Sequence, residues 1–319
     1  MLQGVKGYRF HLDTAAIIMQ RTQPILLVGY GYLGRRLVKH CVAVGRPVCV
    51  ITRSSAHQGE LEALGVEYQI LDLDTDSGSL TIPVADKVIL YTAPPAGPGT
   101  DPRLLSLLGR LGERPAKLVY ISTSGVYGDC QGDRVDENTP VNPGSERARR
   151  RVAAEQAVSE WAEDKQIPWT VLRVPGIYGP ERLPLAALAN GDAFLRPEDA
   201  GPGNRIHVDD LLECCLAAAD NPLASGIFNV GDGNPLSATG FAQATARATG
   251  LKAPRLVSRS EAPQVIGPGR WSFLSESRLL DVRRMQEKLA PALKYSNPLD
   301  GLVASLKEMG IEVVNTPQG

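Results

Sequence analysis

The sequence is poor in the residues that build metal sites and disulfide frameworks. Its 319 residues include four histidines and five cysteines, and no CxxC or Cys/His spacing joins the cysteines. We therefore expect no zinc site and no disulfides, which fits a reducing, cytoplasmic compartment. A P-loop lysine and a G-x-S-x-G elbow are also missing, so the sequence gives no support to a kinase or a hydrolase.

A strong net charge and long apolar runs are absent as well. The formal net charge is -1, so nothing global argues for nucleic acid or an anionic membrane surface as a partner. No apolar run approaches the roughly 20 residues that a membrane helix needs. Residues 1–23 precede the first expected strand. Their apolar stretch at 15–19 is too short for the core of a signal peptide, so we treat them as an extension of unknown role.

What the chain does contain is an alternation of short apolar runs and amphipathic segments. Strands are expected at 24–28, 47–51, 66–71, 87–91, 117–121 and 169–174, and helices at 33–44, 104–111 and 146–165. A helix at 208–219 and a strand at 227–230 are expected to return to the same sheet, and a further helix at 237–249. This order predicts an α/β fold with a doubly wound parallel sheet.

A glycine-rich turn lies between the first strand and the first helix. Residues 29–34 read Gly-Tyr-Gly-Tyr-Leu-Gly, the GxGxxG pattern that binds dinucleotides in this context. Gly29 permits the turn, Gly31 lets the backbone approach a pyrophosphate, and Gly34 lets the helix pack on the strand. The helix start at Tyr32 and Leu33 offers free N–H groups to the phosphates. The alternative is a tight turn with no ligand.

This turn predicts a Rossmann-type domain and a division of the chain. The expected dinucleotide-binding domain covers residues 24–175 and also receives 204–231. Pro and Gly cluster after Pro175, and we expect 176–203 and 232–319 to form a smaller C-terminal substrate lobe.

The end of the second strand bears on the choice between NAD and NADP. NAD-binding proteins usually carry an acid there that accepts from the ribose 2′-hydroxyl. This chain has Thr52-Arg53-Ser54 instead. Arg53 is suited to pair with a 2′-phosphate, which favours NADP while NAD stays possible. Otherwise Arg53 is a solvated loop cation.

Further segments follow the glycine turn in a fixed order. They are Asp72-Leu73, Thr92-Ala93-Pro94, 121–128 (ISTSGVYG), 172–180 (LRVPGIYGP), 205–210 (RIHVDD) and 228–231 (FNVG). Together they resemble the extended short-chain dehydrogenase/reductases, the NAD-dependent epimerase/dehydratase family, over about residues 24–250. The resemblance implies contacts from Asp72 and Leu73 to adenine, a turn at Thr92 and Ala93 over the cofactor, and a loop from Pro175 over the nicotinamide. It also implies a homodimer.

The resemblance breaks at the catalytic residues. The family uses Ser/Thr with a YxxxK pair, and Thr123 matches the Ser/Thr. The YxxxK position falls on Arg147 and Arg151, as in the atypical branch of the family. A guanidinium is never deprotonated in a protein, so Arg147 cannot be the general base. Arg151 keeps the charge that holds the ribose hydroxyls. Tyr127 is the nearest phenol to Thr123 and is either an acid/base or a packing residue.

The remaining candidates concern the substrate. Arg147 either binds an anion in the substrate cleft or belongs to a solvated basic face, which an Arg151–Glu155 pair would partly relieve. By resemblance, Asn204 and Arg205 line the pocket and Tyr178 shapes the nicotinamide end. His207 either lines the pocket or satisfies a backbone carbonyl.

The function expected from these residues is hydride transfer between a nicotinamide and a small carbonyl or hydroxyl substrate. Thr123 would orient the substrate oxygen, and the proton would come from Tyr127 or from water held by Thr123. A non-catalytic NADP(H) sensor is the alternative, favoured by the missing YxxxK. A nucleotide-sugar epimerase is disfavoured because Gly176 stands where such enzymes often carry Asn.

Overall fold

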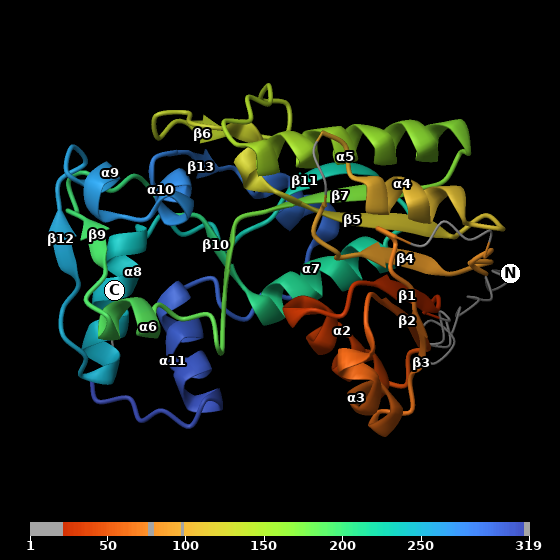
Figure 1. The fold of residues 1–319 in the computed structure, drawn as a ribbon, viewed down its shortest axis with the longest axis horizontal. Coiled ribbons are helices and arrows are strands. Elements are labelled where there is room, and N and C mark those ends of the chain that lie inside the picture. The colour runs from red at the N-terminus through yellow and green to blue at the C-terminus, as the bar shows by residue number, and fades with distance from the viewer. Residues whose placement is uncertain (1–21, 76–79, 97–98, 316–319) are drawn as a thin grey trace, which may run out of the picture.

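The fold centres on one parallel sheet. The structure is a computed structural model and describes residues 22–75, 80–96 and 99–315. Seven parallel strands lie in the order β11-β7-β5-β4-β1-β2-β3 (Figure 1). Their bounds are Ile25–Val28 (β1), Val48–Thr52 (β2), Glu67–Ile70 (β3), Val88–Tyr91 (β4), Lys117–Thr123 (β5), Trp169–Val174 (β7) and Gly226–Asn229 (β11). The predicted α/β Rossmann-type fold is confirmed.

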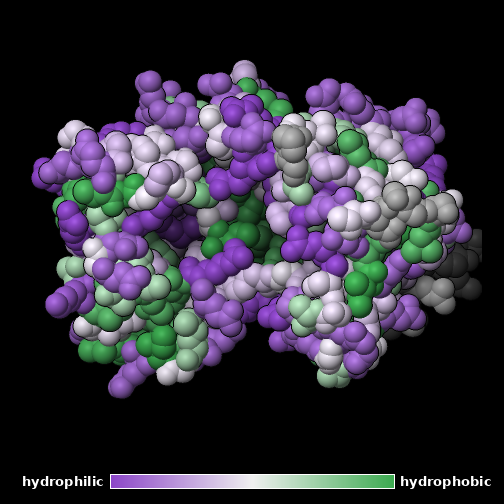
Figure 2. Space-filling view, in the orientation of Figure 1, coloured by the Kyte–Doolittle hydropathy of each residue, from purple (hydrophilic) through white to green (hydrophobic). Residues whose placement is uncertain are grey.

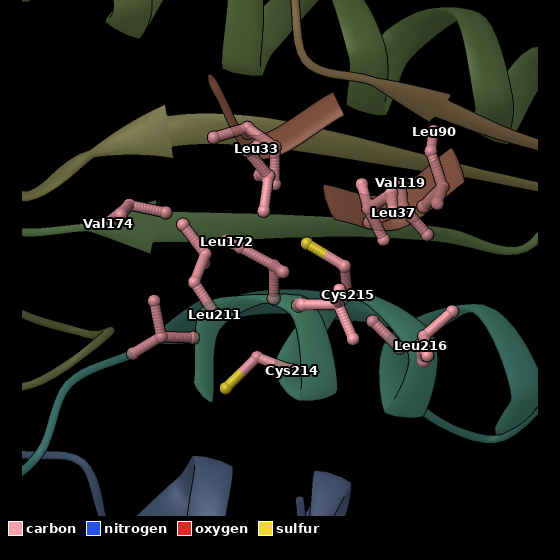
Figure 3. Packing of buried hydrophobic residues seen from close by; sticks show 14 of the residues in the cluster. Leu33, Leu37, Leu90, Val119, Leu172, Val174, Leu211, Cys214, Cys215 and Leu216 are labelled. Carbon is pink, nitrogen blue, oxygen red and sulfur yellow. The ribbon is translucent and has the colours of Figure 1, made fainter. Parts of the chain in front are cut away.

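Helices cover both faces of this sheet. One face packs against α2 (Tyr32–Ala43), α3 (Gln58–Ala63) and α7 (Val208–Asp220), as Figure 3 shows for α2 and α7. The other face packs against α4 (Pro102–Gly109) and α5 (Glu146–Asp164). In β5, Val119 joins the first cluster while Leu118 and Tyr120 join the second. Successive side chains of a strand point to opposite faces, so a continuous apolar run is needed for a sheet buried on both sides.

The strand order reverses between β1 and β4, which lie side by side while their chain connections run to opposite sides. Ligands of open α/β sheets bind at the carboxyl ends of the strands beside such a reversal. The glycine turn at residues 29–34 follows β1 at this point.

A smaller lobe lies at the left of Figure 1. It contains α6 (Leu185–Ala189), α8 (Ala238–Thr249), α9 (Ala262–Val265), α10 (Pro268–Leu274) and α11 (Pro298–Glu308), with β9 (Ala193–Leu195) paired to β12 (Arg255–Val257). Its apolar side chains form clusters separate from those of the sheet, with Phe241 and Leu302 in one and Ala262 in another. None of the helices in the described ranges is both long and apolar enough to cross a membrane.

One part of the expected lobe belongs to the large core instead. β13 (Leu279–Leu280) pairs with β6 (Arg134–Val135), and the helical turn Met285–Leu289 packs under α7. Leu280, Val282, Met285 and Leu289 are all buried in the cluster of the main sheet. This stretch of the expected lobe 232–319 thus packs with the main sheet. Residues 1–21 of the expected extension lie outside the described residues.

Candidate functional site

The glycine turn has the geometry of a dinucleotide cradle. Gly29 has φ +104°, and a Cβ there would lie 2.8 Å from the Ala93 nitrogen. A Cβ on Gly34 would overlap the Gly29 carbonyl oxygen, whereas one on Gly31 would meet nothing within 4 Å. The three glycines thus serve the turn, the helix–strand packing and an open approach for a ligand.

Within the described ranges, no side chain caps the start of α2. Gly31 is its N-cap and makes no side-chain cap, and the first helical bond is from Arg35 N to Gly31 O. The N–H groups of Tyr32, Leu33 and Gly34 precede that bond and have no acceptor within the helix. Free N–H groups at a helix start are suited to bind an anion.

A cavity of about 260 Å³, here termed the glycine-turn cavity, opens beside this turn. The expected cofactor residues that line it are Gly29, Gly31, Arg53, Asp72, Leu73, Thr92 and Ala93. The Thr92 hydroxyl donates to the Gly29 carbonyl at 2.9 Å, which fixes the two loops together. These residues come from the ends of four strands, and their role in binding a cofactor stays a prediction.

Sequence reasoning missed other polar residues in this cavity. Ser54, His57 and Arg103 also line it. His57 Nδ1 lies 2.9 Å from Arg35 Nη2, and Arg103 donates to the Pro94 carbonyl at 2.9 Å. Ser54 and His57 begin and end the short helical turn at 54–57, and Arg103 belongs to α4. Neither segment carries a sequence motif.

A second cavity, the inter-lobe cavity of about 310 Å³, lies where the carboxyl ends of β5 and β7 meet the small lobe. Of the expected residues, it is lined by Thr123, Arg147, Pro175, Asn204 and Arg205. The lobe adds Leu195, Thr239, Phe273, Leu274, Glu276 and Arg278. On the side drawn in Figure 2, the surface is hollowed between the sheet domain and the small lobe, and hydrophilic residues border the hollow. The two cavities share no lining residue.

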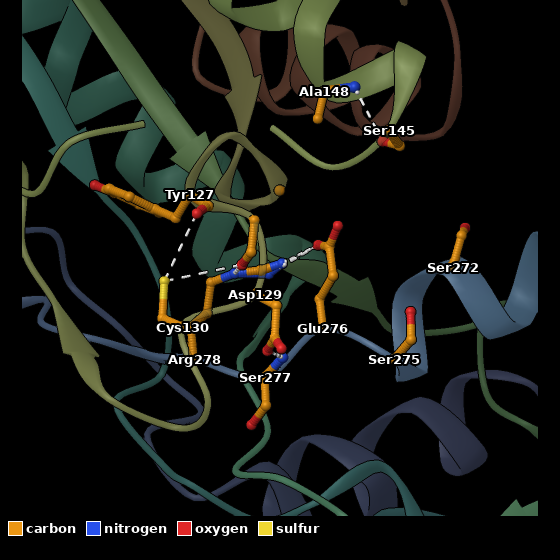
Figure 4. A network of polar contacts seen from close by, with 12 residues as sticks. Tyr127, Asp129, Cys130, Ser145, Ala148, Ser272, Ser275, Glu276, Ser277 and Arg278 are labelled. Carbon is orange, nitrogen blue, oxygen red and sulfur yellow. Dashed lines mark hydrogen bonds and ion pairs between the residues drawn. The ribbon is translucent and has the colours of Figure 1, made fainter. Parts of the chain in front are cut away.

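Several contacts hold the walls of the inter-lobe cavity. Thr123 Oγ1 accepts from the Gly125 N–H at 3.2 Å, which leaves its own proton free to donate. The Arg147 guanidinium carbon lies 3.9 Å from the centre of the Phe273 ring. Glu276 and Arg278 face each other at 2.5 Å (Figure 4). The Asn204 amide donates to the Arg278 carbonyl at 2.7 Å and so ties the lobe to the strand end.

Tyr127 does not reach this cavity. It is 1% exposed, and its hydroxyl donates to Asn229 Oδ1 at 2.7 Å in the core. Its ring extends away from Glu276 in Figure 4. Burial raises the pKa of Tyr127, which opposes deprotonation further. The expectation of a catalytic Tyr127 is corrected, because its hydroxyl is held by a core partner.

Tyr178 and His207 are also core residues rather than pocket residues. Their rings pack edge to face with centres 5.1 Å apart. His207 Nδ1 accepts from the Asp209 N–H at 3.2 Å, and its Nε2 lies 3.1 Å from Ser305 Oγ. Burial lowers the pKa of His207 to about 4, so the ring is neutral at physiological pH. His207 thus caps the start of α7 by accepting from a backbone N–H group, whereas a hydrogen bond to a backbone carbonyl was the expectation.

Arg151 and Tyr32 lie outside both cavities. Arg151 Nη1 donates to the Tyr120 hydroxyl at 3.0 Å and to the Ile121 carbonyl at 2.5 Å, so the expected hold on a ribose finds no support. The Tyr32 hydroxyl donates to the Pro180 carbonyl at 2.6 Å. Its side chain lines a third cavity of about 590 Å³, where opposite charges such as Arg36 and Asp209 are paired with each other.

The comparison with known sequences agrees with this geometry. The sequence model of the NAD dependent epimerase/dehydratase family matches residues 25–231, from β1 to just past β11. The chain belongs to the NAD dependent epimerase/dehydratase family. The match includes the glycine turn and the Thr123 strand end and stops before most of the small lobe.

Three similar proteins show how far the likeness extends along the chain. Protein YeeZ of Escherichia coli (strain K12) is 25% identical over 86% of this chain and 97% of its own length. A functionally unknown conserved protein from Silicibacter pomeroyi DSS superposes with a TM-score of 0.75 and 29% identity, over 90% of this chain and 99% of that one. The UDP-glucuronic acid 4-epimerase of Bacillus cereus, solved with UDP-glucuronic acid and NAD, shares the fold at a TM-score of 0.69 and 19% identity, over 90% and 99%.

Proposed function

We propose that the protein is an NADP-dependent oxidoreductase that acts on a small carbonyl or hydroxyl substrate. The observation that carries this proposal is the glycine turn, whose three glycines and free helix start fit the pyrophosphate of a dinucleotide. The similar UDP-glucuronic acid 4-epimerase of Bacillus cereus is described as a complex with UDP-glucuronic acid and NAD. The glycine-turn cavity would hold the adenosine end, and the inter-lobe cavity the substrate.

The preference for NADP rests on charge. Arg53 lines the glycine-turn cavity and is exposed, and Ser54 and His57 border the same space, whereas Arg103 on this wall is paired with Asp74. A 2′-phosphate gains charge-assisted hydrogen bonds from such groups, while NAD would lack the usual acid for its 2′-hydroxyl.

The chemistry would take place at Thr123. A bound nicotinamide supplies hydride transfer to or from a carbonyl or carbinol carbon. The Thr123 hydroxyl, whose oxygen accepts from Gly125 N–H, donates to the substrate oxygen and orients it. The proton that the substrate oxygen gains or loses would pass through the Thr123 hydroxyl to or from water, because the Tyr127 hydroxyl is held in the core by Asn229.

Calorimetric titration of the purified chain with NADPH, NADP⁺, NADH and NAD⁺ tests the proposal. We expect NADP(H) to bind more tightly than NAD(H), and Arg53→Ala to remove at least about tenfold of that preference. Arg255→Ala is the matched control, since Arg255 is exposed on β12 of the small lobe. Binding of none of the four nucleotides would refute the proposal, and binding without turnover on any carbonyl would identify a binding protein instead.

A further inference from the structure

The inter-lobe cavity carries an excess of positive charge. Its charged lining residues are Arg147, Arg205, Arg278 and Glu276. Glu276 pairs with Arg278 at 2.5 Å, so these two charges offset each other. Arg147 and Arg205 are left without an ion-pair partner within 4 Å among the described residues. The cavity therefore presents two guanidinium groups that no described side chain pairs with within 4 Å, although Glu276 and Asp232 attract Arg147 and Arg205 from farther away.

Arg205 gives the stronger indication of a ligand, because its side chain is buried and only 7% exposed. Its Nη2 donates to the Ser237 carbonyl at 3.2 Å, and its guanidinium lies 4.7 Å from the centre of the Phe241 ring. Its Nη1 has no hydrogen-bond partner in the described part of the chain. A buried, charged donor left unpaired is costly, so its presence points to a partner that the protein itself does not contain.

The neighbouring acid Asp232 does not fill that role. Its Oδ2 is also without a hydrogen bond among the described residues. Burial raises the pKa of Asp232 to about 7, so the carboxyl is largely protonated in slightly acidic solution and only partly charged at neutrality. Asp232 therefore attracts Arg205 electrostatically, but no ion pair within 4 Å joins the two side chains in the described part of the chain.

Arg147 brings the second guanidinium from a different element. It stands in the first turn of α5, beside Ser145, and rests on Phe273 of α10. Resting on the ring fixes the direction of the guanidinium without using its N–H groups, which stay available for an acceptor. The helix start adds a partial positive charge at the same wall of the cavity.

We propose that the inter-lobe cavity recognises a small anionic substrate, with Arg205 and Arg147 binding its carboxylate or phosphate group. This inference rests on the proposed function, in which the same cavity takes the substrate. A volume of about 310 Å³ lies at the lower end of ligand pockets, which suits a small molecule. Thr123 lines the same cavity, so the anion would be held at one end while the reacting oxygen meets Thr123.

The test is calorimetry on the full chain saturated with NADP⁺, using sodium phosphate and sodium malonate as separate probes at constant ionic strength. We expect saturable binding of at least one probe, and which one binds distinguishes a phosphate from a carboxylate ligand. Arg205→Gln and Arg147→Gln should each weaken it by about tenfold or more. Arg149→Gln is the control, because it stands two residues along the same helix with a side chain 53% exposed and paired with Glu146.

Equal affinity in all variants, or no binding of either probe to a chain that still binds NADP⁺, would overturn this inference and leave the proposed function standing. If Arg205→Gln fails to fold, the Arg147→Gln variant still tests the inference, because Arg147 is exposed. Should no dinucleotide bind, the proposed function fails, and the phosphate titration of the nucleotide-free protein is repeated. Loss of binding in Arg147→Gln but not in Arg53→Ala would then still support the anion site.

Discussion

Removing Glu155 should destabilise the protein strongly, because it is the buried partner of a buried arginine. Glu155 on α5 and Arg173 on β7 have side chains 7% and 5% exposed, with N···O distances of 2.8 to 3.3 Å. Ser122 Oγ also donates to the Glu155 carboxylate. Truncating one member of such a pair leaves the other charge buried and costs about 3–5 kcal/mol. Glu155→Leu should therefore lower the free energy of unfolding by about this amount.

Urea unfolding, followed by tryptophan fluorescence and far-UV circular dichroism, measures this change. In the double variant Glu155→Leu/Arg173→Met an apolar pair replaces the ions, and most of the loss should be recovered. The recovery should fall short by about 1 kcal/mol, since the Ser122 hydroxyl loses its acceptor. Glu146→Leu, on the same helix but in an exposed pair with Arg149, should have a far smaller effect. A loss under about 1 kcal/mol in Glu155→Leu, or a double variant no more stable than the singles, would refute the reasoning.

Three further changes are expected. Asp232→Asn should be more stable than wild type by on the order of 2 kcal/mol at pH 8 and equal to it near pH 4. Burial raises the pKa of Asp232 in the folded protein to about 7, so wild-type stability falls as the pH rises from about 4 to about 7. Unfolding measured at both pH values checks this. Gly34→Ala should weaken NADP⁺ binding by about tenfold or more, while Gly59→Ala, with open space around its Cβ position, should not; calorimetry separates them. Tyr127→Phe should keep cofactor affinity and any turnover but lose about 1–2 kcal/mol of stability, because its hydroxyl is the buried donor to Asn229; a loss of turnover with unchanged stability would contradict its core role.

The sheet was predictable because its signal is local. β1 is a continuous apolar run, β5 and β7 each have an apolar stretch within them, and the glycine turn marks where the first strand meets the first helix. The strands β6 and β13 contain two residues each, and β9 and β12 contain three. Such short segments carry no measurable periodicity, so their pairing is decided by tertiary contacts that no window of sequence reveals.

The candidate site was predictable in part for the same reason. Residues at strand ends, such as Thr123 and Asp72, line cavities because the strand ends share one edge of a parallel sheet. The environment of His207 depends on Ser305, which is 98 positions away in the chain. Glu155 was expected to pair with Arg151 four residues earlier, yet it pairs with Arg173 of the neighbouring strand. A helical spacing rule describes an exposed surface and fails where the helix face is buried against a sheet.

The separation of the two cavities has a consequence for how such proteins diverge. Every residue that lines the glycine-turn cavity lies between positions 28 and 103, and every residue that lines the inter-lobe cavity lies between 123 and 278. A substitution of a lining residue of one cavity therefore replaces no lining residue of the other. Proteins with this architecture can therefore diverge in the inter-lobe cavity while the glycine-turn cavity stays the same. A chimaera joined between the two stretches should combine the glycine-turn cavity of one relative with the inter-lobe cavity of another.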